Sequence, residues 1–240
     1  MNPLRSYKIG LLALLIVSML DLYLWYNGLL LYRLGTLLLI VPILFLLFWN
    51  LLKTNLSLSI ALFFCWLGDL FLLHDVNHTI QILGVSSYMM AHFFFIESLL
   101  KRIKKFSLIS FMMGVLFFGA YLMVFFSNIL SCLKDMKFIG IAYGLVLGFL
   151  GCLSIMNFFI HQSRLQFSLF GGIFLFSVRD VMLTYNKYYF NEDYFILGVD
   201  IFYVVGLYLI LQYFKTTESE IQHAKEPNFS TLNKSSKAQN

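Results

Sequence analysis

Apolar residues fill eight long stretches of the chain, and polar residues gather in the short connections between them. Each stretch holds roughly 20 residues, the length that spans the hydrocarbon core of a bilayer as an α-helix. The stretches lack the alternation of polar and apolar residues that is typical of membrane β-barrel strands. The pattern therefore predicts an all-α polytopic membrane protein with helices near residues 8–26, 31–50, 56–74, 80–100, 107–127, 138–160, 167–187 and 194–214.

The end of the chain has a different character. From Thr216 the sequence becomes polar, and its last twenty residues show almost no apolar periodicity. A segment of this kind buries too little apolar surface to offset the entropy lost on ordering. We therefore predict one membrane domain over residues 1–215 and a disordered tail over residues 216–240. Within the domain, Gly144, Gly148 and Gly151 have the small-residue spacing that favours close helix packing.

Basic residues are divided unequally between the two sets of connections. Nine lie on the side that holds both termini, and four lie on the other side. Because lysine and arginine are enriched in cytoplasmic connections, this bias places both termini in the cytoplasm. The first set is Arg5, Lys8, Lys53, Lys101, Arg102, Lys104, Lys105, Arg164 and Lys215, and the second is Arg33, Lys134, Lys137 and Lys187.

Composition agrees with a multi-pass membrane protein, in the cell membrane if the source is bacterial. Hydrophobic residues make up 60% of the chain and charged residues only 12%, about half the charged fraction of soluble domains. The net charge of +5 comes from connections and termini, so it reports topology and gives no reason to expect a nucleic-acid partner. Three cysteines without CxxC spacing argue against a disulfide framework or a zinc site. We expect no metal and no cofactor.

Two of the acidic residues inside the apolar stretches stand out, because they lie deeper than Asp21. Asp69 lies in the run from Leu56 to Leu73, and Asp180 lies in the seventh stretch. Ionisable residues inside a membrane are rare, and by default they mark functional sites. The predicted topology brings further polar residues to the same outer depth, and we expect a polar cavity that opens to the non-cytoplasmic side. These further residues are Asp21, Arg33, Arg179, Asp200 and Tyr203.

Structural alternatives exist for each of these residues. Arg179 and Asp180 could be an ion pair that locks helices together, with Asp69 or Asp200 as a further partner. Asp21 and Arg33 lie near helix ends and could reach the interface by snorkelling. His92 suits a buried core histidine as well as a site residue. A solvated turn is the simpler explanation for the polar group at His74, Asp75, Asn77 and His78, although its spacing could hold a metal.

Three blocks of sequence resemble the YhhN-like lysoplasmalogenases, a family of integral membrane alkenyl-ether hydrolases. The blocks are GDLFL at residues 68–72, LGVSSYMMAHF at 83–93 and GIFLFSVRD at 172–180, and NKY at 186–188 continues the match. The resemblance implies an eight-helix fold. It also implies hydrolysis of the vinyl ether bond of a lysoplasmalogen, a lysophospholipid of the membrane, to a fatty aldehyde and a glycerophospho-choline or -ethanolamine.

The resemblance also implies roles for particular residues. Asp69 would be the acid that protonates the vinyl carbon, and Asp180 the base or the stabiliser of the oxocarbenium ion, as with the paired carboxylates of glycosidases. His92 would position groups or relay a proton, and Arg179 or Arg33 would hold the lipid phosphate. The remaining candidates for substrate binding are Asp200, Tyr203 and Asn186.

Two positions depart from the family pattern. Arg179 stands where the family has a serine, and Leu207 stands where it has a glutamine. A cation beside Asp180 keeps that carboxylate ionised and disfavours it as a proton donor. Retention of the activity therefore stays open. The alternatives are an ion-coupled carrier, although few Gly or Pro interruptions support one, and a non-catalytic lipid-binding membrane protein.

Overall fold

The computed structural model describes residues 3–72, 78–130, 132–133, 136–190 and 192–225. In these ranges the chain forms nine α-helices and one π-helical turn, and it contains no strand. The helices are α1 (Pro3–Tyr26), α2 (Leu30–Leu47), α3 (Trp49–Leu52), α4 (Leu56–Leu72), α5 (His78–Leu100), α6 (Leu108–Ile129), α7 (Lys137–His161), α8 (Arg164–Tyr185) and α9 (Asp193–Lys225), and the π turn is η2 (Asn186–Phe190).

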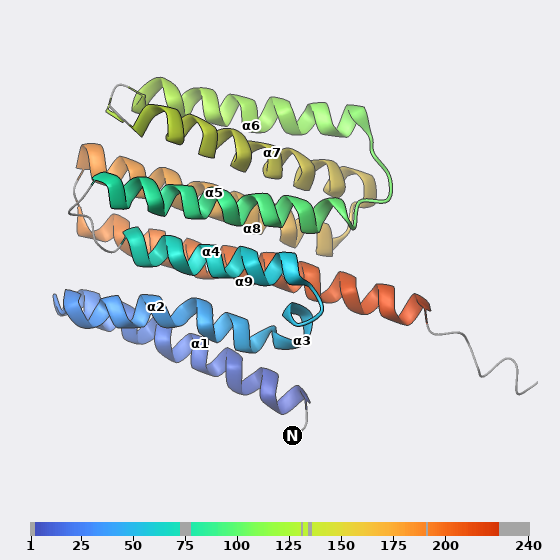
Figure 1. Cartoon of the computed structure of the whole chain (residues 1–240), viewed down its shortest axis with the longest axis horizontal. Helices are drawn as coiled ribbons and strands as arrows, with labels where there is room; N and C mark the ends of the chain where they lie inside the picture. Colours follow the sequence, from blue (N-terminus) through green and yellow to red (C-terminus); the bar gives the residue numbers. More distant parts are fainter. Residues whose placement is uncertain (1–2, 73–77, 131, 134–135, 191, 226–240) are drawn as a thin grey trace, which may run out of the picture.

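The long helices run back and forth across the molecule, roughly side by side (Figure 1). The closest packing occurs within the pairs α1–α2, α4–α5, α6–α7 and α8–α9. Further contacts join α2 to α4, α5 to α7 and α7 to α8. The largest apolar core lies where α4, α5, α7, α8 and α9 meet, around fully buried residues such as Leu62, Phe95 and Phe176.

Local sequence explains several helix ends. The α1–α2 turn contains Gly28 at a φ of 68°, a left-handed conformation that glycine adopts without a steric penalty. The helices α6 and α8 begin after Ser107 and Ser163, whose side chains accept hydrogen bonds from the backbone N–H groups of Ser110 and Gln166. Serine is a favoured residue at this position because its hydroxyl satisfies an amide that the helix leaves unpaired.

The predicted fold class is confirmed: the chain is an all-α polytopic membrane protein. Each of the eight apolar stretches corresponds to one long helix. Among the described residues, six helices are long and apolar enough to cross a membrane, while α4 and the segment Tyr32–Leu47 of α2 are apolar but shorter. The number of helices that span the membrane and the cytoplasmic placement of the termini stay predictions.

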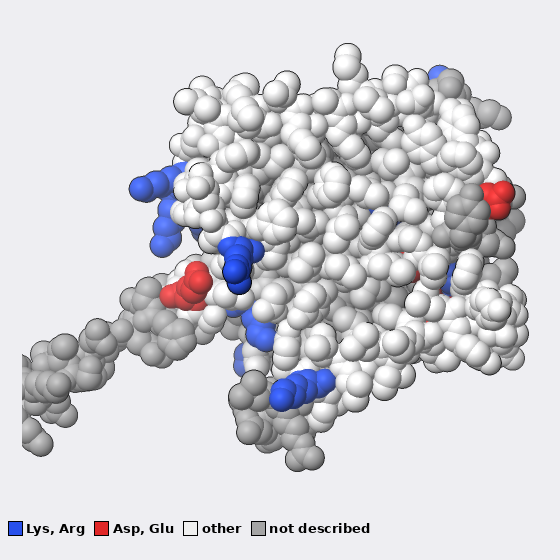
Figure 2. Space-filling model, turned by 180° about the vertical axis from the view of Figure 1, so that it is seen from behind, with Lys and Arg blue, Asp and Glu red and all other residues white. Residues whose placement is uncertain are grey.

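The surface carries its charges at the ends of the helices. Figure 2 shows lysine and arginine side chains gathered at the end where α5 leads into α6, and a broad uncharged band over the middle of the molecule. Large apolar side chains such as Leu46, Leu116 and Met123 are exposed on the helices, at 72%, 69% and 76%. Exposed apolar area on this scale is expected of a surface that faces lipid rather than water.

Small residues bring helices close together, as predicted for α7. An added Cβ at Gly144, Gly148 or Gly151 would approach side chains of α6 to within 2.5, 2.7 and 2.2 Å. A contact between two backbones joins α8 to α9. An added Cβ at Gly172 would lie 2.8 Å from the carbonyl oxygen of Gly206, so the two backbones meet there. This contact fixes the spacing of the two helices that carry Asp180 and Tyr203.

Helix α9 continues to Lys225, through the first ten residues of the segment that we assigned to the tail. Glu218 in this extension forms an ion pair with Arg102 at 2.8 Å. The Arg102 guanidinium also lies over the ring of Phe214, 4.8 Å from its centroid. The extension is thereby joined to the connection between α5 and α6. The last part of the predicted tail, residues 226–240, lies outside the described residues.

Candidate functional site

One guanidinium group bridges the two carboxylates that the sequence singled out. Arg179 Nη1 donates to Asp180 Oδ1 at 2.9 Å, and Arg179 Nη2 lies 3.9 Å from Asp69 Oδ1. All three side chains are largely buried, with 7%, 15% and 10% of their surfaces exposed for Arg179, Asp180 and Asp69. Asp69 and Asp180 therefore lie close together, and the arginine that departs from the family pattern lies between them.

Three tyrosines complete the hydrogen bonding of the carboxylates. Tyr88 and Tyr203 donate their hydroxyl protons to the two oxygens of Asp69, the second at 2.6 Å, and Tyr143 donates to Asp180 Oδ2. Tyr88 also accepts a hydrogen bond from Arg179 Nη2 at 2.8 Å. Charge-assisted hydrogen bonds of this kind hold side chains in one geometry.

The rings of these tyrosines also contribute to the site. The Arg179 guanidinium carbon lies 4.7 Å from the ring centroid of Tyr88 and 4.8 Å from that of Tyr203. A cation over an aromatic face is attracted by the ring quadrupole, more strongly when water is excluded. The two rings therefore help to offset the cost of burying the arginine. Its Nε atom has no hydrogen-bond partner among the described residues.

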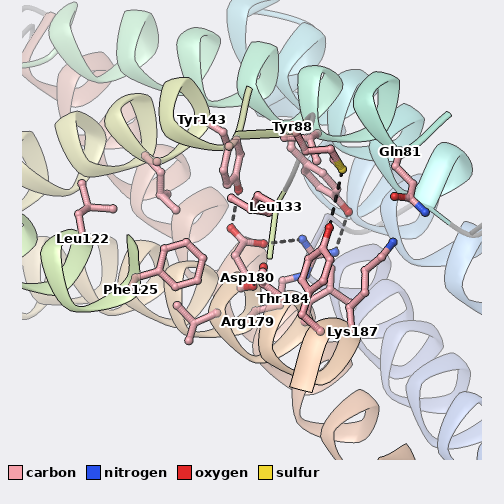
Figure 3. A pocket seen from close by; sticks show the side chains of 18 of the residues that line it. Gln81, Tyr88, Leu122, Phe125, Leu133, Tyr143, Arg179, Asp180, Thr184 and Lys187 are labelled. Atoms are coloured by element: carbon pink, nitrogen blue, oxygen red, sulfur yellow. Dashed lines mark hydrogen bonds and ion pairs between the residues drawn. The ribbon is translucent and has the colours of Figure 1, made fainter. Parts of the chain in front are cut away.

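A mostly apolar cavity of about 130 Å³ adjoins this cluster, between α5, α6, α7 and α8. Asp180, Arg179, Tyr88 and Tyr143 line it, whereas Asp69 does not. Figure 3 shows the Asp180 carboxylate directed toward the Tyr143 hydroxyl, with apolar side chains such as Leu122 and Phe125 beside it. A water molecule needs roughly 10–15 Å³ of such space, so the cavity has room for several.

The cavity reaches the end of the molecule opposite the basic residues of the α5–α6 connection. There it is lined by Leu133, Met136, Lys187 and Tyr188. Lys187 and Tyr188 belong to η2, where the backbone leaves α-helical geometry. Single π turns inside helices occur frequently at functional sites. Asn186, a predicted site residue, begins this turn and accepts a hydrogen bond from the backbone N–H of Glu192 at 2.7 Å, so it holds the chain after the turn rather than lining the cavity.

A second ionic cluster lies elsewhere, between α1, α2 and α9. Arg33 is paired with both Asp21, at 3.5 Å from Nε to Oδ2, and Asp200. Thr36 also donates to Asp21, at 2.6 Å. The structure therefore does not place Arg33, Asp21 and Asp200 beside Asp180, as the argument from equal depth had suggested. Equal depth leaves open which side of its helix a residue occupies, and these three residues meet one another between α1, α2 and α9.

Two further predicted positions are core residues in the structure. His92 is 2% exposed, and its Nδ1 donates to the carbonyl oxygen of Tyr88 at 2.6 Å. Its ring packs edge-on against Tyr143 and Phe176. His92 therefore supports the tyrosines of the site without lining the cavity. Leu207 is fully buried in the apolar core and brings no polar atom to the place of the family's glutamine.

Metal ligands do not gather in the described part of the chain: no three His, Cys, Asp or Glu side chains there could hold one ion. Cys65, Cys132 and Cys152 form no disulfide with one another. Three members of the polar turn that we considered as a metal site, His74, Asp75 and Asn77, lie outside the described residues.

Sequence reasoning missed Tyr88 and Tyr143 as site residues. Each lies in an apolar stretch, where a tyrosine is indistinguishable from a packing residue. A usable signal was the position of Tyr88 inside the second family-like block, four residues before His92 and therefore about one helical turn away.

Comparison with known proteins places this architecture in a family. No match is found among curated proteins, and none among solved structures. The model of the YhhN family matches residues 32–214. The matched region runs from the beginning of α2 into α9 and includes every residue of the Asp69–Arg179–Asp180 cluster, while α1 precedes it. The chain belongs to the YhhN family.

Proposed function

We propose that the protein hydrolyses the vinyl ether bond of a lysoplasmalogen. Water and the alkenyl ether give a fatty aldehyde and a glycerophospho-choline or -ethanolamine. Family membership supports a hydrolase of this kind. The observation that carries the proposal is the pair of buried carboxylates held by one guanidinium beside an apolar cavity.

The reaction needs a proton and a stabilised cation. Addition of a proton to the outer alkenyl carbon converts the ether into an oxocarbenium ion, and water then adds to the carbon next to oxygen. The hemiacetal collapses to aldehyde and alcohol. Asp69 supplies the proton in this proposal, because Asp180 is the carboxylate at the shorter distance from the Arg179 cation.

Asp180 then has the second role. It lines the cavity, so its negative charge can face the developing oxocarbenium ion and accept a proton from the attacking water. Preorganised charge directed at the reacting atoms is commonly the largest contribution to catalysis. Tyr143 and Arg179 hold this carboxylate from two directions, so that little reorganisation is needed during the reaction.

The lipid would lie with its alkenyl chain among the apolar walls of the cavity and its phosphate toward Lys187 at the outer end. Of the two arginines that the sequence offered as phosphate ligands, Arg33 does not line the cavity, and Arg179 lines it beside Asp180. Lys187 lines the cavity at the end of the molecule opposite the α5–α6 connection, where a head group would remain near water.

The test is aldehyde release from a lysoplasmalogen by the purified protein in detergent. The matched substrates are the 1-alkyl lysolipid, which lacks the vinyl double bond, and the 1-acyl lysolipid, which reports ester hydrolysis. We expect aldehyde only from the alkenyl lipid. A wild-type protein that releases none from that lipid overturns the proposal.

One observation favours a second candidate, a lipid-binding protein without catalysis: Arg179 neutralises carboxylates that a hydrolase would use. Arg179→Ser restores the residue typical of the family. An inactive wild type that gains aldehyde release on this substitution favours the non-catalytic function. An active wild type that loses activity with Arg179→Ser favours the enzyme, with the arginine as part of its site.

A further inference from the structure

Asp69 has no direct access to the cavity in which the proposed reaction would occur. It is absent from the cavity lining, and the rings of Tyr88 and Tyr203 lie around it. A proton that starts on Asp69 must therefore pass through another group before it reaches a lipid beside Asp180.

Two side chains connect Asp69 with the cavity: Arg179 and Tyr88 both contact its Oδ1 atom and both line the cavity wall. A guanidinium group does not give up a proton in proteins, whereas a phenol hydroxyl both donates and accepts. Tyr203 also binds Asp69, at 2.6 Å, but it does not line the cavity. Of these three side chains, Tyr88 alone both lines the cavity and can donate and accept a proton.

We propose, on the basis of the proposed function, that Tyr88 is the proton donor to the lipid and that Asp69 reprotonates it. The Tyr88 O–H bond breaks, and the π electrons of the vinyl group form a new C–H bond at the outer alkenyl carbon. A lone pair on the ether oxygen forms the second C–O bond of the oxocarbenium ion. The step starts from a protonated Asp69 that donates to the tyrosine oxygen, the reverse of the hydrogen bond that Tyr88 donates to Asp69 in the structure. This carboxyl proton moves to the tyrosine oxygen and leaves a carboxylate.

The surroundings of the Tyr88 hydroxyl suit this step. Arg179 Nη2 donates a hydrogen bond to its oxygen at 2.8 Å, and the guanidinium also lies over its ring at 4.7 Å. Both contacts stabilise the negative charge that grows on the phenol oxygen as its proton departs. The arginine that replaces the family serine thereby has a role in this site, as the group that makes a tyrosine a usable acid.

The decisive comparison is Tyr88→Phe against Tyr203→Phe. Each variant removes one hydroxyl from Asp69 and keeps the ring, but only the first removes a hydroxyl from the cavity wall. We expect kcat for aldehyde release to fall about 10²- to 10⁴-fold with Tyr88→Phe. With Tyr203→Phe it should fall by less than about tenfold, the value of one hydrogen bond to a neutral carboxyl group, because Asp69 is protonated when the step begins.

A second measurement remains informative even if Tyr88→Phe folds poorly. Site-specific 3-fluorotyrosine at position 88 keeps shape and hydrogen bonding but loses its proton more readily. It should change kcat for aldehyde release clearly more than the same label at position 203 does, because only the hydroxyl at position 88 passes its proton to the lipid. Equal changes in kcat for the two labels would show that Tyr88 acts only as a hydrogen-bond partner of Asp69.

The outcomes separate the two proposals. If the wild type releases aldehyde and the two Phe variants lose equal activity, or if fluorotyrosine changes kcat equally at positions 88 and 203, Tyr88 is not the donor and the hydrolase function stands. If the wild type releases no aldehyde, the function and the proton donor fall together.

Discussion

The ring of Tyr88 lies directly against the backbone of Gly68: a Cβ at position 68 would stand 2.8 Å from both Cδ2 and Cε2 of the tyrosine. These are rigid ring atoms between α4 and α5, so they can move away only if the ring tilts. Because Gly68 has no Cβ, the Tyr88 ring can lie against it, and the Tyr88 hydroxyl can reach the carboxylate of the next residue, Asp69.

Gly68→Ala should consequently damage both stability and activity. Overpacking of this kind costs about 1–3 kcal/mol, and displacement of the Tyr88 hydroxyl should lower aldehyde release as well. Thermal unfolding in detergent and kcat provide the two measurements. Gly119→Ala on α6 is the control, because no atom lies within 4 Å of its added Cβ. A Gly68→Ala variant with an unchanged melting temperature and an unchanged kcat would contradict the described packing.

A second pair of glycines tests the contact between α8 and α9. Gly172→Ala should lower the free energy of unfolding by about 1–3 kcal/mol, because its Cβ would approach the backbone oxygen of Gly206 to 2.8 Å. Its neighbour Gly171→Ala meets nothing within 4 Å and should be neutral or stabilising. Equal melting temperatures for the two variants would show that the helices are farther apart than described.

Substitution of either site carboxylate separates chemistry from stability. Asp69→Asn and Asp180→Asn keep the side-chain shape but cannot carry the reaction's proton, so aldehyde release should fall at least about 10²-fold. If the acids serve only as ion-pair partners, the main effect should instead be on the melting temperature. Full activity in either variant would refute the assigned mechanism.

The second ionic cluster gives a prediction about stability alone. Arg33→Met leaves Asp21 and Asp200 buried without a cation and should cost about 3–5 kcal/mol. Asp200→Asn leaves Arg33 paired one to one with Asp21, so the loss should stay within about 1.5 kcal/mol. Thermal unfolding of the two variants provides the comparison. An Asp200→Asn variant as unstable as Arg33→Met would mean that Asp21 is not an adequate partner.

Topology is open to cysteine labelling. In a protein whose three native cysteines are replaced, a cysteine at Asn240 or Ser163 should react with an impermeant reagent only after the membrane is opened. A cysteine at Asn27, in the exposed α1–α2 turn at the other end, should react in intact cells. The reverse pattern would reject the orientation inferred from the basic residues.

Much of the helical architecture could be predicted from the sequence, because an apolar run of roughly 20 residues is long enough to span a bilayer as a helix. The extension of α9 could not, since residues 216–225 are polar and the partner of Glu218, Arg102, lies on a distant connection. Only part of the site could be predicted, because contacts between distant helices are likewise not visible in the sequence. Asp69 and Asp180 are conspicuous among apolar neighbours, whereas Tyr88 and Tyr143 are visible only through their contacts.

The sequence also did not show toward which neighbouring helix each polar side chain points. Asp200 and Tyr203 are three residues apart on α9, a rotation of roughly 60°. That rotation is sufficient for Asp200 to reach Arg33 while Tyr203 reaches Asp69. Helix α9 lies between the two clusters and supplies one side chain to each. Asp200 and Tyr203 have a similar predicted depth in the membrane, so depth alone could not assign them to different clusters.

The Asp21–Arg33 pair also implies an order of biosynthesis. An arginine entering the bilayer alone costs about 2.5–3.5 kcal/mol on insertion scales. Because Asp21 and Arg33 lie on consecutive helices, the newly made α1–α2 hairpin carries its own counterion into the membrane. Asp200 is translated 167 residues after Arg33, at the beginning of the last helix. Its arrival completes the cluster and docks α9 against the α1–α2 hairpin, which was inserted earlier.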